Sequence, residues 1–234
     1  MNPRAAPVNV RLTTLEPQPC PYLPGRGETV SALMAASIDG ATYHAFLEAG
    51  FRRSGKMIYQ PVCDGCSECV SIRVPVNTFT PTSSQKRSVR KNDDLRVTFG
   101  VPIFTEEKFA MYARYVRQWH KREQDANEES MRQFLYDSPT DTVEFCYRDK
   151  SEKLVGVGIC DIGPSSLSSV YFYFDPDEAS RSPGTFSAMY EIDWARARKL
   201  AHYYLGYWIR DCSAMAYKAN FTPHELLGAD GVWR

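Results

Sequence analysis

Thr142-Val-Glu-Phe-Cys-Tyr-Arg148 begins a run of three strand-like segments, which continues with Lys153-Leu-Val-Gly-Val-Gly-Ile-Cys-Asp-Ile162 and Leu167-Ser-Ser-Val-Tyr-Phe-Tyr-Phe-Asp175. Each segment is rich in aromatic and β-branched residues, and turn-forming residues separate them. Ser182-Pro-Gly-Thr185 then begins a helix that should end near Leu200, and Tyr203–Ile209 predicts a further strand. Strands, a helix and a strand in this order predict an α+β sheet domain.

The first hundred residues predict a different kind of unit. Four prolines between residues 17 and 24 favour an extended, irregular arm. The patterns that follow predict helices at Thr42–Ala49 and Ser83–Leu95, strands at Met57–Tyr59, Val70–Val76 and Arg96–Val101, and, past residue 100, a third helix at Glu106–Arg122. Ser83 or Ser84 should cap the second helix, and the third should bury a face made of Phe109, Tyr112, Val116 and Trp119. We expect residues 1–100 to form a module and residues 101–234 to form the sheet domain.

The formal net charge of zero hides an uneven distribution of charge along the 234 residues. Residues 1–91 carry 11 Lys and Arg against 6 Asp and Glu, whereas residues 92–234 carry 17 against 22. The excess is concentrated in residues 52–91, with 8 basic and 2 acidic side chains. This asymmetry indicates a region that faces a polyanion, although a chance cluster on one solvated face would give the same counts.

Several classes of protein are excluded or disfavoured by the composition. No stretch approaches the roughly 20 apolar residues that a membrane-spanning helix needs. The first residues, MNPRAAPVNVRLTT, contain no apolar core of a signal peptide. An aromatic content of 13% argues against disorder. We expect a cytoplasmic globular protein.

The seven cysteines suggest either a metal site or free thiols. An odd number without a secretory signal favours a reducing compartment. Cys63-Asp-Gly-Cys66-Ser-Glu-Cys69 places three thiols at the two-residue spacing of zinc knuckles and iron–sulfur loops, and Cys20 is the candidate fourth ligand. The spacing does not choose between zinc, a cluster and free thiols beside a pocket. We expect Cys146 and Cys160 to be ordinary core residues.

The order of sheet and helix resembles the core of GNAT-type acyl-CoA N-acyltransferases. Those enzymes carry R/Q-x-x-G-x-G/A where the helix begins, because backbone amides there bind pyrophosphate. This chain reads Arg181-Ser-Pro-Gly184-Thr-Phe186, so phenylalanine replaces the last small residue. The departure argues against CoA as the acyl carrier, and the basic first half of the chain suggests RNA instead.

Seven motifs, in order over Cys20–Arg234, resemble those of the aminoacyl-tRNA–protein transferases, and most closely the short bacterial type that transfers leucine. They are Cys20-Pro-Tyr-Leu-Pro-Gly-Arg26, Gly50-Phe-Arg-Arg-Ser-Gly55, Cys63–Cys69 with Ser71-Ile-Arg-Val-Pro-Val76, Phe79-x-Pro-x-x-Ser-Gln-Lys-Arg87, Ser169-Val-Tyr-Phe-Tyr-Phe-Asp-Pro176, Tyr204-Leu-Gly-Tyr-Trp-Ile209 and Met215-x-Tyr-Lys218 with Phe221-x-Pro. The relatives that transfer arginine have adjacent paired cysteines, unlike the spaced cysteines here.

The resemblance implies a GNAT-like acyltransferase domain with the cysteine-containing module packed on it. It also implies transfer of leucine from leucyl-tRNA to proteins that begin with Asp or Glu, which marks them for degradation by the N-degron pathway. No cofactor is required for that transfer. Three alternatives stay open: an arginyl-tRNA donor, a CoA-dependent N-acetyltransferase, and a non-enzymatic RNA-binding module.

Such a reaction joins an activated ester to an α-amine, so it needs positioning and oxyanion stabilisation more than a covalent nucleophile. Asp161 or Asp175 is a candidate to hold the incoming ammonium and accept its proton. Tyr171 is a candidate to bond the ester or the leaving ribose oxygen, and Tyr207 resembles a family position near the same cleft. Asp175-Pro176-Asp177 is also an ordinary turn signal.

Two sets of cations are candidate binding residues. An acidic acceptor side chain should meet arginine, so we consider Arg52, Arg53 and Arg73, with Lys218 as a further candidate. A surface arginine that covers apolar neighbours is the alternative. A second set lies at i, i+1, i+4 and i+5 of the basic helix and should contact the tRNA acceptor phosphates, unless it is merely a solvated helix face: Lys86, Arg87, Arg90 and Lys91.

Overall fold

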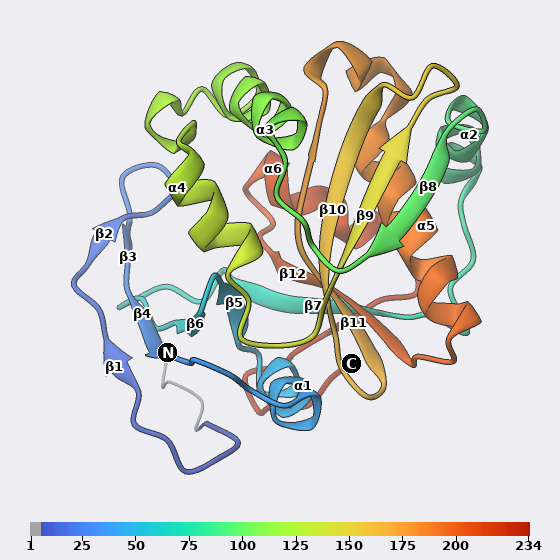
Figure 1. Ribbon diagram of the computed structural model, residues 1–234. Coiled ribbons are helices and arrows are strands. Elements are labelled where there is room, and N and C mark those ends of the chain that lie inside the picture. Colours follow the sequence, from blue (N-terminus) through green and yellow to red (C-terminus); the bar gives the residue numbers. More distant parts are fainter. Residues whose placement is uncertain (1–5) are drawn as a thin grey trace.

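The computed structural model describes residues 6–234. Its centre is a mixed sheet in which seven strands follow one another from edge to edge (Figure 1). Their order is β13 (Glu225–Leu226), β7 (Val70–Pro75), β12 (His202–Trp208), β11 (Ser166–Phe174), β10 (Leu154–Ile162), β9 (Thr142–Arg148) and β8 (Arg96–Gly100). The three predicted strands β9, β10 and β11 are confirmed, and they form the antiparallel centre of the sheet.

One pair of neighbouring strands is parallel and separates soon after it forms. β11 and β12 pair only where Ser166–Ser168 face His202–Tyr204. Beyond that point β11 continues to Phe174 and β12 to Trp208 without pairing to each other. The backbone polar groups that face the opening must therefore be satisfied by side chains, by water or by a ligand.

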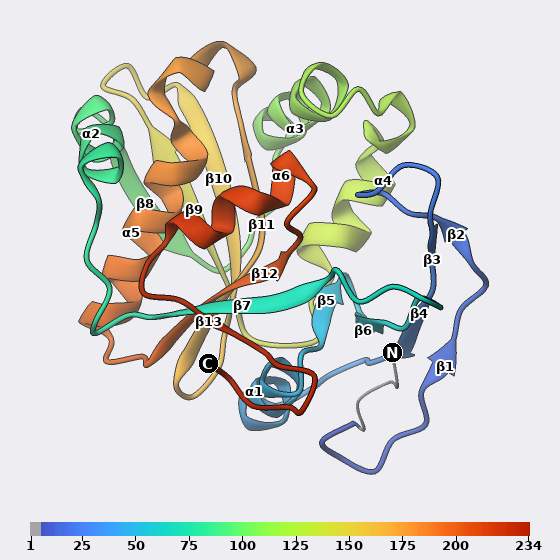
Figure 2. The ribbon, with the colours of Figure 1, turned by 180° about the vertical axis from the view of Figure 1, so that it is seen from behind.

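Helices cover both faces of this sheet. On one face α5 (Pro183–Ala197) and α2 (Ser83–Lys91) lie side by side (Figure 2), and Phe186, Ile192 and other apolar residues pack against β9 and β12. On the other face lie α3 (Glu106–Gln118), α4 (Glu128–Met131) and a π-helical turn at Arg132–Tyr136. The α+β prediction is confirmed by this arrangement of strands and helices.

The N-terminal residues form a smaller sheet packed against the larger one. Its order is β1 (Thr13–Thr14), β4 (Val30–Met34), β6 (Met57–Pro61) and β5 (Arg52–Ser54), while β2 (Gln18–Pro19) pairs with β3 (Gly27–Glu28). The arm predicted as irregular therefore contains short strands. Helix α1 (Gly40–Glu48), capped by Asp39, buries Tyr43 and Phe46 in a cluster that includes Tyr204 of β12. The N-terminal residues therefore pack on the seven-stranded sheet, as predicted.

The large sheet crosses the boundary that we predicted at residue 100. β7 and β8 precede this boundary, yet β7 pairs with β12 and β8 pairs with β9. Strand pairing joins segments that are far apart in the sequence. The hydrophobic pattern of a single strand does not determine which other strand it will pair with.

Some local predictions differ from the structure. Thr82, rather than Ser83 or Ser84, caps α2, because it accepts a hydrogen bond from the Gln85 amide while the Gln85 side chain accepts one from the Thr82 amide. Trp119 follows the end of α3 and is 52% exposed rather than buried. The remaining short elements are α6 (Ser213–Ala216) and the 3₁₀ turns Glu123–Asp125, Pro176–Arg181 and Tyr217–Asn220.

Within residues 6–234, no helix combines the length and the apolar character needed to cross a membrane.

Candidate functional site

A cavity of about 100 Å³ lies where β11 and β12 separate. Three cationic side chains line it: Arg52 and Arg53 from β5, and Lys218 from the turn after α6. We call it the cationic cavity. Ser169 of β11 and Tyr207 of β12 also line it. The structure thus brings together three of the four residues predicted to bind an acidic acceptor.

Glycine at position 206 allows two of these cations to approach β12 closely. Gly206 has a φ of +90°, which favours glycine. A Cβ atom there would lie 3.4 Å from Lys218 Nζ and 3.6 Å from Arg52 Nη2. The predicted motif Tyr204-Leu-Gly-Tyr-Trp-Ile209 therefore contains a residue that shapes the cavity.

Arg53 is already neutralised by a buried carboxylate. Its Nε and Nη2 donate to the two oxygens of Asp161 at 2.7 and 2.8 Å. Tyr43 Oη and Thr142 Oγ1 also donate to Asp161, each at 2.7 Å, and Asp161 is fully buried. All four hydrogen bonds of Asp161 are made within the protein, so its carboxylate acts on the cavity through Arg53.

Arg52 and Lys218 carry charges that no carboxylate balances. Arg52 donates to Ser168 Oγ at 3.0 Å and to the Ser169 carbonyl, which satisfies polar groups at the opening between the strands. Lys218 Nζ donates to the Tyr207 carbonyl at 2.8 Å. In the part of the chain from residue 6 onward, no acidic side chain forms an ion pair with either cation. Burial and the nearby Arg52 lower the pKa of Lys218 to about 7.

An excess of buried positive charge is unfavourable unless a ligand supplies the counter-charge. The cationic cavity is thus suited to an anionic group small enough to fit about 100 Å³, such as a carboxylate.

Two predicted catalytic residues lie away from the cationic cavity. Tyr171 packs among Tyr112, Tyr115 and Phe134 on the α3 side of the sheet, and burial raises its pKa. Asp175 lies five residues beyond Val170 of the cavity wall, about 16 Å along an extended strand.

Asp175 has a structural set of contacts. It forms ion pairs with Arg114 at 3.0 Å and Lys153 at 2.9 Å and accepts a hydrogen bond from the Asp177 amide. Burial alone would raise its pKa, but the Lys153 hydrogen bond and these other partners outweigh burial and lower it. The turn that we weighed as the alternative is the observed structure at Asp175-Pro176-Asp177.

The remaining two candidates differ in their relation to the cavity. Tyr207 lines it, but its hydroxyl donates to the Gly50 carbonyl at 3.0 Å, and its pKa is raised by burial. Arg73 is not part of the lining. It pairs with Glu48 and with Glu225, the latter at 2.6 Å, and stacks on Trp233 at 4.3 Å. Two carboxylates therefore already compensate the charge of Arg73.

The alternating rings Tyr171, Phe172, Tyr173 and Phe174 of β11 all pack in the core. All four pack against apolar clusters on the two faces of the sheet. The large rings of this strand serve the core, and its cavity-lining residues are Ser169 and Val170.

Helix α2 exposes the predicted basic stripe and anchors its other side with polar contacts. Gln85 donates to the Asn220 carbonyl at 3.1 Å and Ser88 to the Ser182 carbonyl at 3.1 Å. Lys91 Nζ donates to the Ser180 carbonyl at 2.8 Å. The other three members are exposed and form no ion pair with a described carboxylate: Lys86, Arg87 and Arg90.

The start of α5 differs from a pyrophosphate-binding helix start. Arg181 pairs with Asp94 and Glu178 at 2.6 and 2.7 Å. Ser88 of α2 bonds the Ser182 carbonyl, and Phe186 is buried in the core. The Arg181 side chain and the Ser182 carbonyl therefore have protein partners, and Phe186, where the GNAT motif has a small residue, belongs to the core.

The four cysteines of the predicted metal site lie in one corner of the N-terminal module. Cys20 Sγ accepts from the Leu23 amide at 3.4 Å, and Cys63 Sγ accepts from the Thr29 amide at 3.4 Å. Cys66 Sγ accepts from Arg26 at 3.3 Å. Burial, and then the other three thiols, raise the pKa of Cys69 to about 12. Within residues 6–234, no three His, Cys, Asp or Glu side chains are arranged to hold a metal ion. Cys160 is buried in the core as predicted, while Cys146 is only half-buried.

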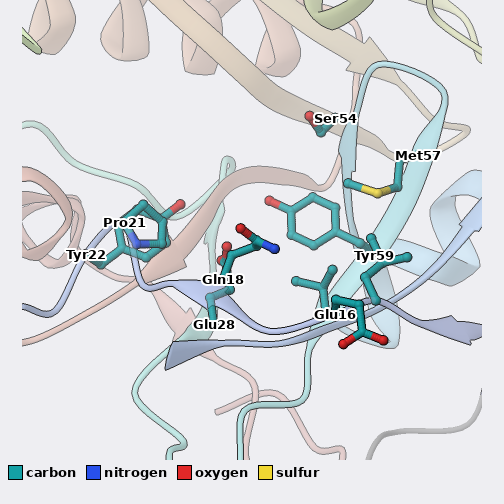
Figure 3. A pocket seen from close by; sticks show the side chains of 10 residues that line it. Glu16, Gln18, Pro21, Tyr22, Glu28, Ser54, Met57 and Tyr59 are labelled. Carbon is teal, nitrogen blue, oxygen red and sulfur yellow. The ribbon is translucent and has the colours of Figure 1, made fainter. Parts of the chain in front are cut away.

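A second cavity, of about 320 Å³, adjoins the first and was not predicted (Figure 3). Tyr22 and Tyr59 line both cavities. Glu28 and Met57 are among the residues that line only the second one. Three consecutive apolar or aromatic residues, Met57-Ile-Tyr59, were a signal that both sides of β6 are covered, but the strand prediction did not use it.

Comparisons with known proteins identify the family of this chain. The family model named for the N terminus of arginine-tRNA-protein transferase matches residues 18–87. The family model named for its C terminus matches residues 107–228. An aspartate/glutamate leucyltransferase of Saccharophagus degradans is 38% identical over 220 residues, which cover 93% of each chain. One of Gluconacetobacter diazotrophicus is 41% identical over 224 residues, which cover 94% of this chain and 85% of that one.

The structural comparison supports the fold alone. The C-terminal DUF2156 domain of an Agrobacterium fabrum protein described as a lysylphosphatidylglycerol synthetase superposes with a TM-score of 0.50 at 14% identity. The match covers 78% of this chain and 62% of that one. The two family models cover most of the chain, and the relatives match over nearly all of it. The chain therefore belongs to the arginine-tRNA-protein transferase family.

Proposed function

We propose that this enzyme transfers leucine from leucyl-tRNA to the α-amine of proteins that begin with Asp or Glu, and so marks them for degradation in the cytoplasm. The relatives named aspartate/glutamate leucyltransferase support the donor and the acceptors. The observation that carries the proposal is the unbalanced positive charge of Arg52 and Lys218 in the cationic cavity.

The reaction needs no group beyond the two substrates. The α-amine nitrogen attacks the leucyl carbonyl carbon, a C–N bond forms, and the ester C–O bond to the terminal ribose breaks. The amine loses a proton and the ribose oxygen gains one, so the products are a peptide bond and free tRNA. An α-amine has a pKa of about 7.7–8.0, so a substantial part of it is neutral near pH 7.5 without a strong base.

The cationic cavity supports recognition of the acceptor side chain. An aspartate or glutamate carboxylate placed there would meet the Lys218 ammonium and the Arg52 guanidinium, which is held by Ser168 and Ser169. Asp161 would position Arg53 rather than accept a proton, because all of its hydrogen bonds are already made. An asparagine or glutamine acceptor would leave both cations without a counter-charge.

The exposed stripe on α2 supports a tRNA contact. Lys86, Arg87 and Arg90 form no ion pair with a described carboxylate, so they can bind phosphates, and this binding weakens as salt rises. The stripe also belongs to a helix that is firmly anchored by Gln85 and Ser88, so its position is fixed relative to the sheet.

The test is incubation of the protein with radiolabelled leucyl-tRNA and peptides that begin with Asp, Glu, Asn or Gln. We expect label in the Asp and Glu peptides only. Arginyl-tRNA and acetyl-CoA in parallel reactions test the two alternative donors. Transfer from either of these in preference to leucyl-tRNA would overturn the proposed donor.

A lysine variant tests the role of the cationic cavity. Lys218→Met should weaken binding of an Asp peptide about tenfold to a hundredfold, because a hydrogen bond to a charged group is worth about 1.5–3 kcal/mol. Binding of the matching Asn peptide should hardly change. Lys150→Met, at an exposed turn, is the matched control. Equal losses for both peptides would show that Lys218 supports the fold instead.

The same lysine predicts a pH dependence. In the protein without bound peptide, the pKa of Lys218 is lowered to about 7, so its ammonium form is lost as pH rises through that value. Binding of an Asp peptide, measured by calorimetry without tRNA, should therefore weaken as pH rises above about 7 and should be accompanied by proton uptake. In Lys218→Met the component centred near pH 7 should disappear, which leaves only the titration of the peptide α-amine.

A zinc ion or an iron–sulfur cluster at the cysteine corner remains a separate proposal, supported by the spacing of the thiols and by the amides that donate to Cys20 and Cys63. Metal analysis of protein purified with and without oxygen tests it, with Cys69→Ser as the variant that should lose the metal. Metal-free protein under both conditions would favour free thiols.

A further inference from the structure

The second cavity has a charge opposite to that of the cationic cavity. Glu16 and Glu28 are among its lining residues, and no Lys, Arg or His side chain is. Within the described chain, Glu28 has no cation within ion-pair distance. Burial raises the pKa of Glu28, and no neighbouring cation opposes this effect. A cationic ligand group would supply what Glu28 lacks.

The same cavity also offers apolar surface. Leu15, Val30 and Met57 contribute to its wall. Figure 3 shows the Tyr59 ring between Met57 and the group formed by Gln18 and Glu28, with its hydroxyl directed toward that group. A ligand that fits must therefore combine a positive charge with an apolar part.

The two substrates of the proposed reaction differ in the charges that they bring. An amino acid esterified to tRNA has an ammonium group but no free carboxylate, since the ester uses it. The acidic acceptor residue brings a side-chain carboxylate. Each cavity thus complements a different substrate, and the shared wall of Tyr22 and Tyr59 places the two substrates next to each other.

We propose that the cavity lined by Glu28 and Met57 binds the aminoacyl group of the donor, with its ammonium on Glu28 and its side chain against Leu15, Val30 and Met57. This inference rests on the proposed function. It places the reacting carbonyl beside the wall formed by Tyr22 and Tyr59. The α-amine of an acceptor residue whose carboxylate lies in the cationic cavity is then within reach of this carbonyl. Burial raises the pKa of Tyr59 to about 12, so its hydroxyl keeps its proton and can donate to the carbonyl oxygen.

The test compares leucyl-tRNA with N-acetylleucyl-tRNA, which lacks the ammonium group, using the same Asp peptide as acceptor. The wild-type protein should have a KM for leucyl-tRNA at least tenfold lower. In Glu28→Gln the KM for leucyl-tRNA should rise about tenfold, so the difference between the two donors should nearly vanish. The KM for the peptide should not change. Glu106→Gln, an exposed glutamate at the start of α3, is the matched control and should behave as the wild type.

A measurement on the wild-type protein guards against a misfolded variant. The stable amide analogue 3′-leucylamino-3′-deoxyadenosine should inhibit transfer competitively with leucyl-tRNA, and its N-acetyl derivative should inhibit at least tenfold less. Equal inhibition by both analogues would overturn the inference. A Glu28→Gln variant that raises the KM for the peptide instead would also overturn it, because the cavity would then hold the acceptor.

The inference and the proposed function fail in different ways. If the wild-type protein transfers no leucine to Asp peptides, the proposed function fails, and the inference fails with it. If transfer is efficient but the ammonium group of the donor has no effect, only the assignment of this cavity fails.

Discussion

Replacing Asp161 by asparagine separates a structural role from a catalytic one. The carboxylate is fully buried and accepts two hydrogen bonds from Arg53 and one each from Tyr43 and Thr142. Asp161→Asn leaves the Arg53 guanidinium buried without a counter-charge and replaces one acceptor oxygen by a donor amide. Breaking a buried ion pair on one side typically costs about 3–5 kcal/mol.

This loss should be visible in unfolding experiments. For a chain of this length, each kcal/mol lowers Tm by about 2–4 °C, so Asp161→Asn should lower it by about 6–20 °C. Urea unfolding at pH 7 gives the free-energy change directly. The double variant Arg53→Gln/Asp161→Asn should be less destabilised than the sum of the single variants, because it removes both buried charges.

Activity distinguishes the two roles. Measured well below Tm, leucyl transfer by folded Asp161→Asn should stay within a few-fold of the wild type. If instead the variant unfolds like the wild type and loses transfer more than a hundredfold, Asp161 takes part in the chemistry. The ion-pair reasoning would then be wrong.

Three further predictions concern other parts of the molecule. Neutralising the stripe on α2 should weaken tRNA binding and make its log–log salt dependence shallower by about three, with the preference for Asp over Asn peptides unchanged; the four residues are Lys86, Arg87, Arg90 and Lys91. Burial raises the pKa of Glu191 to about 7, so the folded state favours its protonated form. The free energy of unfolding should fall by up to about 3 kcal/mol as pH rises from about 4.5 through 7, and Glu191→Gln should flatten this dependence in urea titrations. Gly55→Ala would place a Cβ atom 2.4 Å from the Gln133 carbonyl oxygen at a φ of +57°. It should therefore lower the free energy of unfolding by about 1–3 kcal/mol, measured by thermal unfolding. Gly65→Ala, which has a similar φ but open space around the Cβ position, should destabilise the protein less.

Local patterns were sufficient to predict most of the secondary structure. The alternation in β7 and the aromatic and β-branched residues of β9–β11 bias each segment toward a strand whatever its partner. The helix that begins after Ser182 was predicted for a similar reason, since proline is favoured in a first helical turn. The prediction of the cap of α2 missed by one residue, because Thr82 and the two serines after it are all favourable caps.

In the candidate site, by contrast, local sequence patterns did not predict which charged residues would pair. Arg52, Arg53 and Arg73 looked alike in the sequence, yet Arg53 meets Asp161, Arg73 meets two glutamates, and Arg52 meets no carboxylate in the described chain. The Arg53–Asp161 pair joins positions 108 residues apart. Nothing in the residues around either partner specifies the other.

The amino-acid sequence alone indicated the family, the class of fold and the set of charged residues to consider, because motifs and periodicity are local properties of a sequence. Only the tertiary structure decided which of those charges are balanced, and that Tyr22 and Tyr59 separate a cationic cavity from an acidic one. The physical reason is that the effect of a charge depends on its burial and on the partners that folding brings within hydrogen-bond distance. Those partners come from strands, such as β5, β11 and β12, that meet only in the folded protein.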